Sequence, residues 1–234
     1  MSESRAVRGL SKSYRTPISG GWLRRLGKLN KAGGWEGDLA RLVSVLAATG
    51  ARFSQIIRMT VADVQELRLM IPVSNKGKGQ KSVTRYAVPV GDDVIAALKP
   101  ATGGRMGHEP LLLRPHWIHV GRGRYKPGER GPWRVPSEIT RPWNVIRQFA
   151  GFPETVIPYS LRHSSIVRAL RNGIPAEMVG KLHDTSPAMI SSNYAAFIVS
   201  ALDEVARLAV IQLTSAPVRT LREVTGQQDA LLNL

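Results

Sequence analysis

Apolar side chains recur at helical spacing just after a basic N-terminal stretch of the chain. This face consists of Leu39, Leu42, Val43 and Leu46. Gly50 stands where a helix ends in the left-handed conformation. The pattern therefore predicts a helix over about residues 36–48, followed by a short helical run from Gln55 to Met59.

Two later runs are rich in branched residues, which is typical of β-strands. They extend from Leu67 to Val73 and from Val83 to Val90. The loop between them contains glycines and the lysines Lys76, Lys78 and Lys81. The sequence therefore predicts a β-hairpin whose loop is a lysine-bearing finger.

The hairpin is followed by a weaker helix signal and then by an irregular region. Asp92 and Asp93 favour the N-terminus of a short helix, which we expect to end before Pro100. Residues 101–136 are rich in Gly, Pro and Arg and show little periodicity. We expect a loop there with one short strand, Leu111 to Leu113.

Helix signals follow one another in the C-terminal part of the chain. The predicted helices run from Ser137 to about Ala150, from Ser160 to Gly173, from Pro175 to Leu182, from Ser186-Pro187 through Tyr194, and from Ala201 to Leu213. Serine and proline are favoured at such helix starts. Together the elements predict a mixed α/β fold, mostly helical with a small antiparallel sheet or hairpin.

Charge extends the prediction from the fold to the partner. The 234 residues include 33 lysines and arginines against 17 acids, so the net charge is +16 and the pI is near 11.0. Such an excess is best tolerated beside a polyanion, most commonly DNA or RNA. Residues 1–33 are predicted to form a basic N-terminal arm, either in contact with DNA or as a solvated tail.

Several kinds of site and location are excluded by what the sequence lacks. The chain has no cysteine, which excludes disulfides, thiolate metal sites and cysteine nucleophiles. No apolar stretch is long enough for a membrane span or follows the pattern of a signal peptide. We therefore expect a cytoplasmic, nucleoid-associated protein, and we expect no cofactor. We also expect no metal, because His108, His116 and His119 lack metal-ligand spacing.

Three separated segments carry side chains suited to attack on a phosphodiester. They are Thr49-Gly50-Ala51-Arg52, Tyr159-Ser160-Leu161-Arg162-His163, and Lys181-Leu182-His183-Asp184 followed by Asn193-Tyr194. Two arginines can hold the non-bridging phosphate oxygens and stabilise the charge of the transition state. A phenol becomes a nucleophile when its proton is removed or cations stabilise its phenolate, and a hairpin lysine could protonate the departing 5′ oxygen.

At these residues the sequence resembles the tyrosine recombinase, or phage integrase, family. The matching residues are Arg52, Lys76 or Lys78, Tyr159 and Arg162, His183, and Tyr194. The resemblance implies a catalytic domain over residues 34–213, preceded by the basic arm and followed by a tail over 214–234. It also implies a metal-independent site-specific recombinase that breaks and rejoins double-stranded DNA through a 3′-phosphotyrosyl link to Tyr194. Four protomers would assemble on two DNA sites.

The chain departs from the family pattern in three ways. Tyr159 stands where the family usually has histidine, so the expected general base is missing or replaced. His183 lies further from Tyr194 than usual, and Thr185 falls at the usual distance, so either residue fills that position. The family's N-terminal core-binding domain is not recognisable before the catalytic pattern, which is expected of an isolated catalytic domain, a truncated gene product or a reduced member of the family.

Each remaining feature has more than one interpretation. A recombinase-derived DNA-binding protein with impaired catalysis, or a type IB topoisomerase-like enzyme, would share the same residues. His163 is expected to have a structural role. The region from Arg114 to Arg134 interleaves basic residues with Trp117, Tyr125 and Trp133, and it is either a nucleic-acid contact or an exposed loop.

Overall fold

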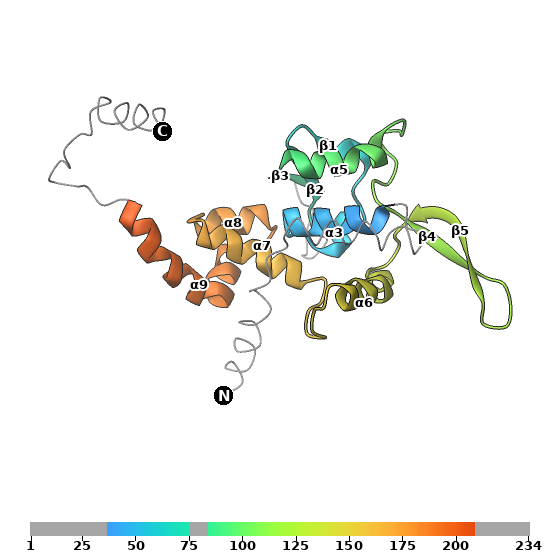
Figure 1. Cartoon of the computed structure of the whole chain (residues 1–234). Helices are drawn as coiled ribbons and strands as arrows, with labels where there is room; N and C mark the ends of the chain where they lie inside the picture. The colour runs from blue at the N-terminus through green and yellow to red at the C-terminus, as the bar shows by residue number, and fades with distance from the viewer. Residues whose placement is uncertain (1–36, 75–83, 209–234) are drawn as a thin grey trace, which may run out of the picture. The chain divides into compact units, whose positions relative to one another are not determined.

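The computed structural model describes residues 37–74 and 84–208 of the chain (Figure 1). The basic arm, the three finger lysines and the C-terminal tail lie outside the described residues. The chain divides after Ala201 into two compact units, and the fold and site below belong to the first. None of the described helices is long and apolar enough to cross a membrane.

Helix α3 (Asp38–Thr49) forms the centre of the packing, and its buried face is the one predicted from the sequence. It contacts α4 (Phe53–Ile56), α5 (Asp92–Thr102) and α7 (Ser160–Arg171). Gly50 ends the helix with a φ of 60° and donates its N–H to the carbonyl of Leu46 over 3.0 Å. The predicted helix and its glycine stop are confirmed.

The predicted hairpin is part of a three-stranded antiparallel sheet, in the order β1-β2-β3. Its strands are β1 (Val64–Gln65), β2 (Arg68–Pro72) and β3 (Arg85–Pro89), preceded by a 3-10 turn at Val61–Asp63. Leu69 pairs with Val88, and both side chains are buried in the core. Side chains alternate between the two faces of a strand, so this register directs one face towards the helices.

Helix α5 (Asp92–Thr102) begins at the two predicted aspartates but continues through Pro100. The expected end before Pro100 was wrong. A proline removes one backbone donor from the helix, and its fixed φ remains compatible with helical geometry. Because Pro100 lies in the last turn, the loss is confined to the end of the helix.

The region predicted as a loop contains a second, two-stranded antiparallel sheet. Strand β4 (Leu113–His119) pairs with β5 (Tyr125–Pro132), and a β-bulge interrupts the register between Pro115 and Trp117. The prediction of a single strand at residues 111–113 was therefore wrong. Pro115 in β4, and the prolines and glycines in β5, hide the usual alternation. A two-stranded sheet consists of edge strands, where proline is tolerated.

The C-terminal part is helical, as predicted. Its elements are a 3-10 turn (Pro136–Ile139), α6 (Thr140–Phe149), α7 (Ser160–Arg171), α8 (Ala176–Leu182) and α9 (Pro187–Leu208). A separate helix was expected from Ala201, but α9 runs through this position. The helical geometry is interrupted instead at Tyr194, which has φ −127° and ψ 16°.

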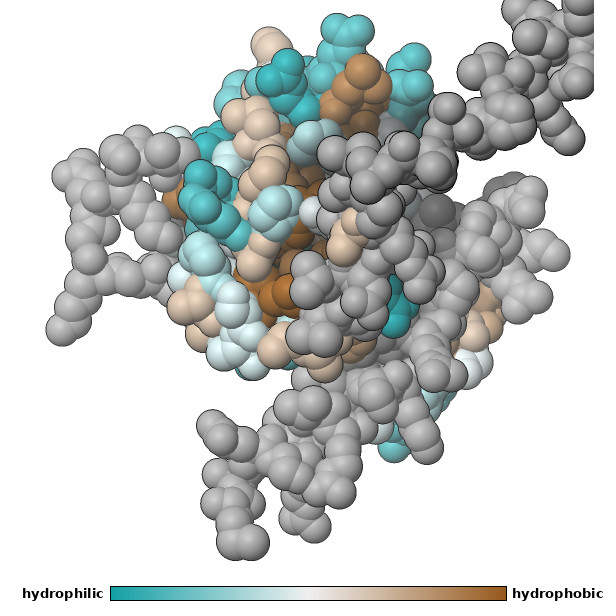
Figure 2. Space-filling view, turned by 90° about the vertical axis from the view of Figure 1, so that its left-hand side faces the viewer, coloured by the Kyte–Doolittle hydropathy of each residue, from teal (hydrophilic) through white to brown (hydrophobic). Residues whose placement is uncertain are grey.

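The interior contains two clusters of buried apolar residues. The larger surrounds α3 and includes residues from the sheet, α5 and α6. The smaller joins α7, α8 and α9 and consists of Ile166, Val167, Leu170, Val179, Ile190 and Tyr194. Figure 2 views the side on which α8 and α9 lie in Figure 1, where hydrophobic and hydrophilic residues are interspersed on the described surface. Because Tyr194 belongs to the smaller cluster, packing within that cluster determines where its side chain lies.

Candidate active site

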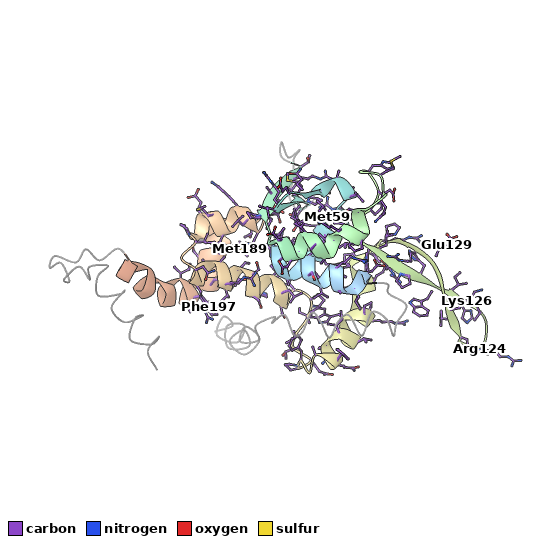
Figure 3. The ribbon with its side chains drawn as sticks, turned by 45° about the horizontal axis from the view of Figure 1, so that its top comes forward. Met59, Arg124, Lys126, Glu129, Met189 and Phe197 are labelled. Carbon is purple, nitrogen blue, oxygen red and sulfur yellow. The ribbon has the colours of Figure 1, made fainter. Side chains whose placement is uncertain are left out.

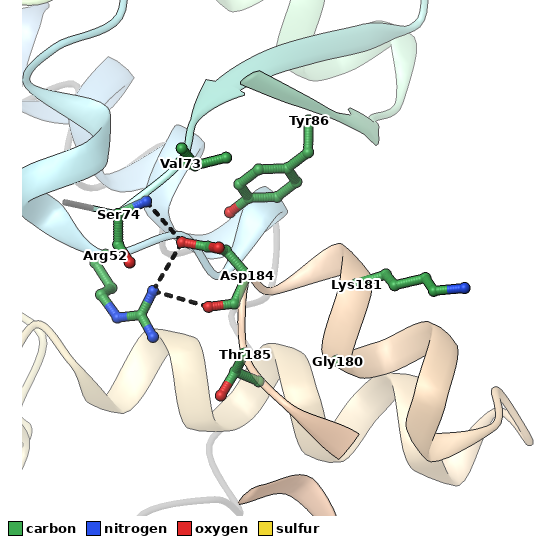
Figure 4. A pocket seen from close by; sticks show the side chains of 8 residues that line it. All are labelled: Arg52, Val73, Ser74, Tyr86, Gly180, Lys181, Asp184 and Thr185. Atoms are coloured by element: carbon green, nitrogen blue, oxygen red, sulfur yellow. Dashed lines mark hydrogen bonds and ion pairs between the residues drawn. The ribbon is translucent and has the colours of Figure 1, made fainter. Parts of the chain in front are cut away.

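A surface pocket with a volume of about 480 Å³ contains the first predicted arginine. It is lined by Arg52, Val73, Ser74, Tyr86, Gly180, Lys181, Asp184 and Thr185 (Figure 4). Arg52 precedes α4, and its backbone N–H donates to Oε1 of Gln55 over 3.0 Å. The turn after Gly50 thus directs Arg52 into the pocket.

Asp184 joins three parts of the chain at this pocket. Its carboxylate accepts hydrogen bonds from Nη1 of Arg52 (3.3 Å), Nε2 of Gln55 (3.1 Å) and the backbone N–H of Ser74 (2.7 Å). Asp184 has a backbone φ of 47°, which is uncommon for residues other than glycine. Ser74 is the last described residue before the finger, so the base of the finger lies at the pocket.

Tyr86 is a pocket residue that the sequence did not single out. Figure 4 shows its hydroxyl directed into the pocket, towards Asp184. Burial raises the pKa of Tyr86 to about 12, although the positive charge of Arg162 opposes this shift. The hydroxyl therefore stays protonated at neutral pH and can donate a hydrogen bond to an anion. The alternating strand pattern around Tyr86 gave no sign of this role.

Arg162 is buried, and two backbone carbonyls hold its guanidinium. Nη1 donates to the carbonyl of Gly50 over 2.9 Å, and Nη2 donates to that of His183 over 2.5 Å. Its Nε has no hydrogen-bond partner among the described residues. Burial lowers the pKa of Arg162, and the positive charge of nearby Arg52 lowers it further.

Two neighbouring guanidinium groups with an unused buried donor are suited to binding an anion. Like charges disfavour each other at short range, and an anion between them removes this penalty. Planar guanidinium groups also match the oxygens of a phosphate better than ammonium groups do. Within the described residues, no three histidine, aspartate or glutamate side chains are grouped as a metal site.

The ring of His183 lies in the core rather than in the pocket. Only 3% of the residue is exposed, with Nδ1 2.9 Å from the carbonyl of Val179 and Nε2 3.0 Å from Oγ of Ser165. A carbonyl only accepts, so Nδ1 carries the proton and Nε2 accepts from Ser165. Burial lowers the pKa of His183 to about 4. Of the two alternatives for this position, Thr185 lines the pocket.

Tyr194 is buried to 6% exposure, and its hydroxyl contacts Nδ1 of His163. His163 directly follows Arg162 in the first turn of α7. Burial lowers the pKa of His163, and the charge of Arg162 lowers it further. The ring of His163 also packs against Tyr159, with 4.8 Å between centroids. The structural role expected for His163 missed this contact, because sequence spacing does not reveal which side chains meet across two helices.

The structure thus brings most of the predicted residues into one region. Arg52 and Arg162 interact electrostatically, and Tyr159 and His163 accompany Arg162 at the start of α7. Tyr194 joins this group through His163. Lys76 and Lys78 lie outside the described residues. Tyr159 is 44% exposed, and its side chain interacts with Arg162.

The model of the phage integrase family matches residues 36–197, more than half of the chain. The chain belongs to the phage integrase family. It is similar to tyrosine recombinase XerD of Corynebacterium glutamicum, with 26% identity over 71% of this chain and 50% of that protein. It is also similar to tyrosine recombinase XerC of Agrobacterium fabrum, with 28% identity over 57% of this chain and 38% of that protein. The chain spans about half the length of the curated relatives it matches.

Solved structures of a recombinase and of an integrase share the fold. The crystal structure of XerA recombinase covers 83% of this chain and 64% of its own, with a TM-score of 0.53 and 20% identity. A structure of the Tn1549 transposon integrase in complex with transposon right end DNA covers 83% of this chain and 65% of its own, with a TM-score of 0.55 and 19% identity. The predicted family and the predicted mixed α/β fold are both confirmed.

Proposed function

We propose that this member of the phage integrase family breaks and rejoins double-stranded DNA as a site-specific recombinase, with Tyr194 as the nucleophile. The contact between the hydroxyl of Tyr194 and His163, beside the Arg52 and Arg162 pair, carries this proposal. Relatives named tyrosine recombinase and a relative solved in complex with DNA support it. The net charge of +16 is also suited to a nucleic-acid partner.

In the proposed reaction, Arg52 and Arg162 bind the non-bridging oxygens of the scissile phosphate. Arg162 is already oriented by two carbonyls, so little reorganisation is needed when charge develops on the phosphate. Arg52 leaves its ion pair with Asp184 to bind the same group. Thr185, rather than His183, would complete this binding site because it lines the pocket.

His163 is the proposed proton acceptor for Tyr194. A neutral imidazole nitrogen accepts a proton from a phenol in contact with it, and the lowered pKa keeps His163 neutral near pH 7. The phenolic oxygen then bonds to phosphorus as the bond from phosphorus to the 5′ oxygen breaks. A finger lysine, Lys76 or Lys78, protonates that oxygen to leave a 5′-hydroxyl. The 3′-phosphotyrosyl link conserves the energy of the broken phosphodiester bond for religation, so no nucleotide cofactor is consumed.

His163 offsets the departure at Tyr159. The family's usual histidine at this position is replaced, yet the imidazole of His163 lies four residues later, in the first turn of the helix that Tyr159 caps, and contacts Tyr194. The side chain of Tyr159 packs edge-on against that imidazole and limits its orientation. Exchange between two DNA sites requires four strand cleavages, so we also propose that four protomers assemble on DNA.

Covalent trapping tests this function without knowledge of the target site. The protein is incubated with plasmids that carry random-sequence inserts, the reaction is denatured rapidly, and protein-linked DNA ends are sequenced. We expect a common sequence with protein on the 3′ ends, and no linked DNA with Tyr194→Phe. If both proteins bind DNA and neither forms links, the chain is a recombinase-derived binding protein. Plasmid relaxation without a partner site would indicate topoisomerase-like activity instead.

A further inference from the structure

The hairpin of β4 and β5 is attached to the core by paired charges at its base. Arg130 donates to both oxygens of Asp38 in α3 over 2.6 Å, and Arg114 forms an ion pair with Glu138 over 2.9 Å. These two arginines therefore have partners within the protein. Figure 1 shows the hairpin extending beyond the helices to which its base is attached.

The far end of the hairpin is cationic and has no acidic neighbour in the turn. Arg122, Arg124 and Lys126 are exposed and form no ion pair with any described residue. Figure 3 shows Arg124 and Lys126 near the tip of the ribbon, with Glu129 further back towards the base. The turn is tight, because Gly121, Arg122 and Gly123 all have positive φ. Three unpaired cations are thus held close together.

Aromatic side chains lie on one face of the same end. His119 pairs with Tyr125 across the two strands, and their ring centroids are 5.1 Å apart. Trp117 lies two residues before His119 and so on the same face. Trp117 is 45% exposed and Tyr125 is 60% exposed. On the opposite face, Ile118 pairs with Lys126 and is 49% exposed.

We propose that the tip of this hairpin is a second DNA-binding element, which enters a groove of the duplex and binds its phosphates. The proposal rests on the proposed function only in taking DNA as the substrate. The major groove of B-DNA admits a two-stranded β-ribbon. The tip cations contact phosphates on the groove edges, while Trp117 and Tyr125 pack on sugars and bases.

Charge complementarity favours DNA over a second copy of this chain as the occupant. Each copy carries a net charge of +16, so two copies that met at cationic tips would repel each other. A polyanion neutralises the three tip cations and covers the exposed rings in the same contact. None of the tip residues lines the pocket that contains Arg52, so the hairpin adds contacts that the catalytic residues do not make.

The test compares two variants that lose the same number of charges, both in a Tyr194→Phe background in which no link can form. The tip variant is Arg122→Asn, Arg124→Gln and Lys126→Gln, with asparagine chosen because it tolerates the positive φ at position 122. The control is Arg68→Gln, Lys99→Gln and Arg141→Gln, three exposed cations outside the hairpin. Binding to a random-sequence duplex is measured over a range of salt concentrations.

We expect the tip variant to bind at least about tenfold more weakly and to reduce the slope of log K against log salt by about 2 to 3, as three lost phosphate contacts require. The control variant should retain most of the DNA affinity and most of the salt slope. Equal effects of the two variants would overturn the proposal. A tip variant that binds DNA normally but changes the sedimentation of the protein would assign the hairpin to contacts between copies, which overturns it too.

A tethered cleavage reagent locates the tip directly, because the chain has no cysteine of its own. Val120→Cys places a single thiol at the turn, and Met106→Cys places one at an exposed position outside the hairpin. With an iron chelate attached, the Val120→Cys protein should cut bound duplex more strongly. Equal cutting by both proteins would contradict the proposal. These tests are independent of covalent trapping. If they give the expected results and the unaltered protein forms no covalent link with DNA, the hairpin contact stands and only the proposed recombinase function is contradicted.

Discussion

The hydroxyl of Tyr194 in α9 contacts Nδ1 of His163, the residue that follows Arg162 in α7. The contact joins the proposed nucleophile to a neutral imidazole beside a buried cation. Both helices belong to the smaller apolar cluster, so their packing maintains this relationship.

Replacing His163 by glutamine should slow covalent link formation on the order of 10²- to 10³-fold, because a positioned general base contributes about this much. DNA affinity should stay near that of the unaltered protein, since the amide fills a similar volume. Single-turnover trapping and a binding titration measure the two quantities. His108→Gln removes an exposed histidine elsewhere and serves as the control. Equal rates for the two variants would show that His163 is not the base.

The pH dependence of link formation should report the same histidine. Burial and then the charge of Arg162 lower the pKa of His163 below its ordinary value of 6.5. The base form therefore persists below pH 6.5, and the rate should decline only at lower pH, as the imidazole becomes protonated. The His163→Gln protein should lack this acidic decline in its residual rate. An unchanged pH profile in the variant would assign the decline to another group.

Asp184→Asn should strengthen the binding of a phosphate analogue such as vanadate by up to about fivefold, because partly exposed ion pairs are worth up to about 1 kcal/mol. The carboxylate pairs with Arg52 and competes with an incoming anion. Calorimetric titration measures the affinity. Glu154→Gln breaks an exposed ion pair with Arg147 and should change nothing. Weaker anion binding by Asp184→Asn would mean that the aspartate orients Arg52 rather than competes for it.

The buried imidazole of His183 should make stability depend on pH. Its pKa is about 4 in the folded chain against 6.5 ordinarily, so the unfolded chain binds the proton more readily between these values. The free energy of unfolding should therefore fall as pH drops from 7 to 5, with this histidine contributing about 2 kcal/mol. Urea unfolding of His183→Gln should show a fall smaller by that amount. An equal fall in both proteins would contradict the burial of the ring.

Gly50→Ala should destabilise the fold more than Gly104→Ala. Both glycines have positive φ, of 60° and 71°, so the backbone cost is similar. A methyl group at Gly50 would lie 2.7 Å from Cβ of Ser165 and 2.8 Å from the ring of His183, whereas at Gly104 it meets nothing within 4 Å. We expect a difference of about 1 to 3 kcal/mol, as overpacking typically costs. Equal unfolding free energies would show that the neighbours shift without cost.

Local signals in the sequence were sufficient for much of the fold. The apolar stripe and Gly50 located α3, and branched residues located β2 and β3. The β4 and β5 hairpin escaped prediction because its prolines and glycines contradict strand propensity, and pairing with a neighbour outweighs that propensity. The end of α5 was missed for a related reason, since Pro100 is tolerated in a last turn.

The candidate site could be predicted in residue types but not in side-chain directions. The order of Arg52, Arg162 and Tyr194 along the chain predicted a phosphate-binding group around a phenol, and these assignments stay predictions until activity is measured. Spacing alone could not show that the ring of His183 is enclosed or that His163 contacts Tyr194. Both depend on how α7 packs against α8 and α9, which is a tertiary property.

The two carbonyls that hold Arg162 have a consequence for how this site tolerates substitution over time. Any amino acid at position 183 supplies the same backbone acceptor, so the side chain there can change while the guanidinium keeps its orientation. Gly50 contributes its carbonyl in the same way, but its φ of 60° and close neighbours restrict replacement. Substitution at position 183 should therefore preserve anion binding, although it should lower stability. Substitution at position 50 should impair both anion binding and stability.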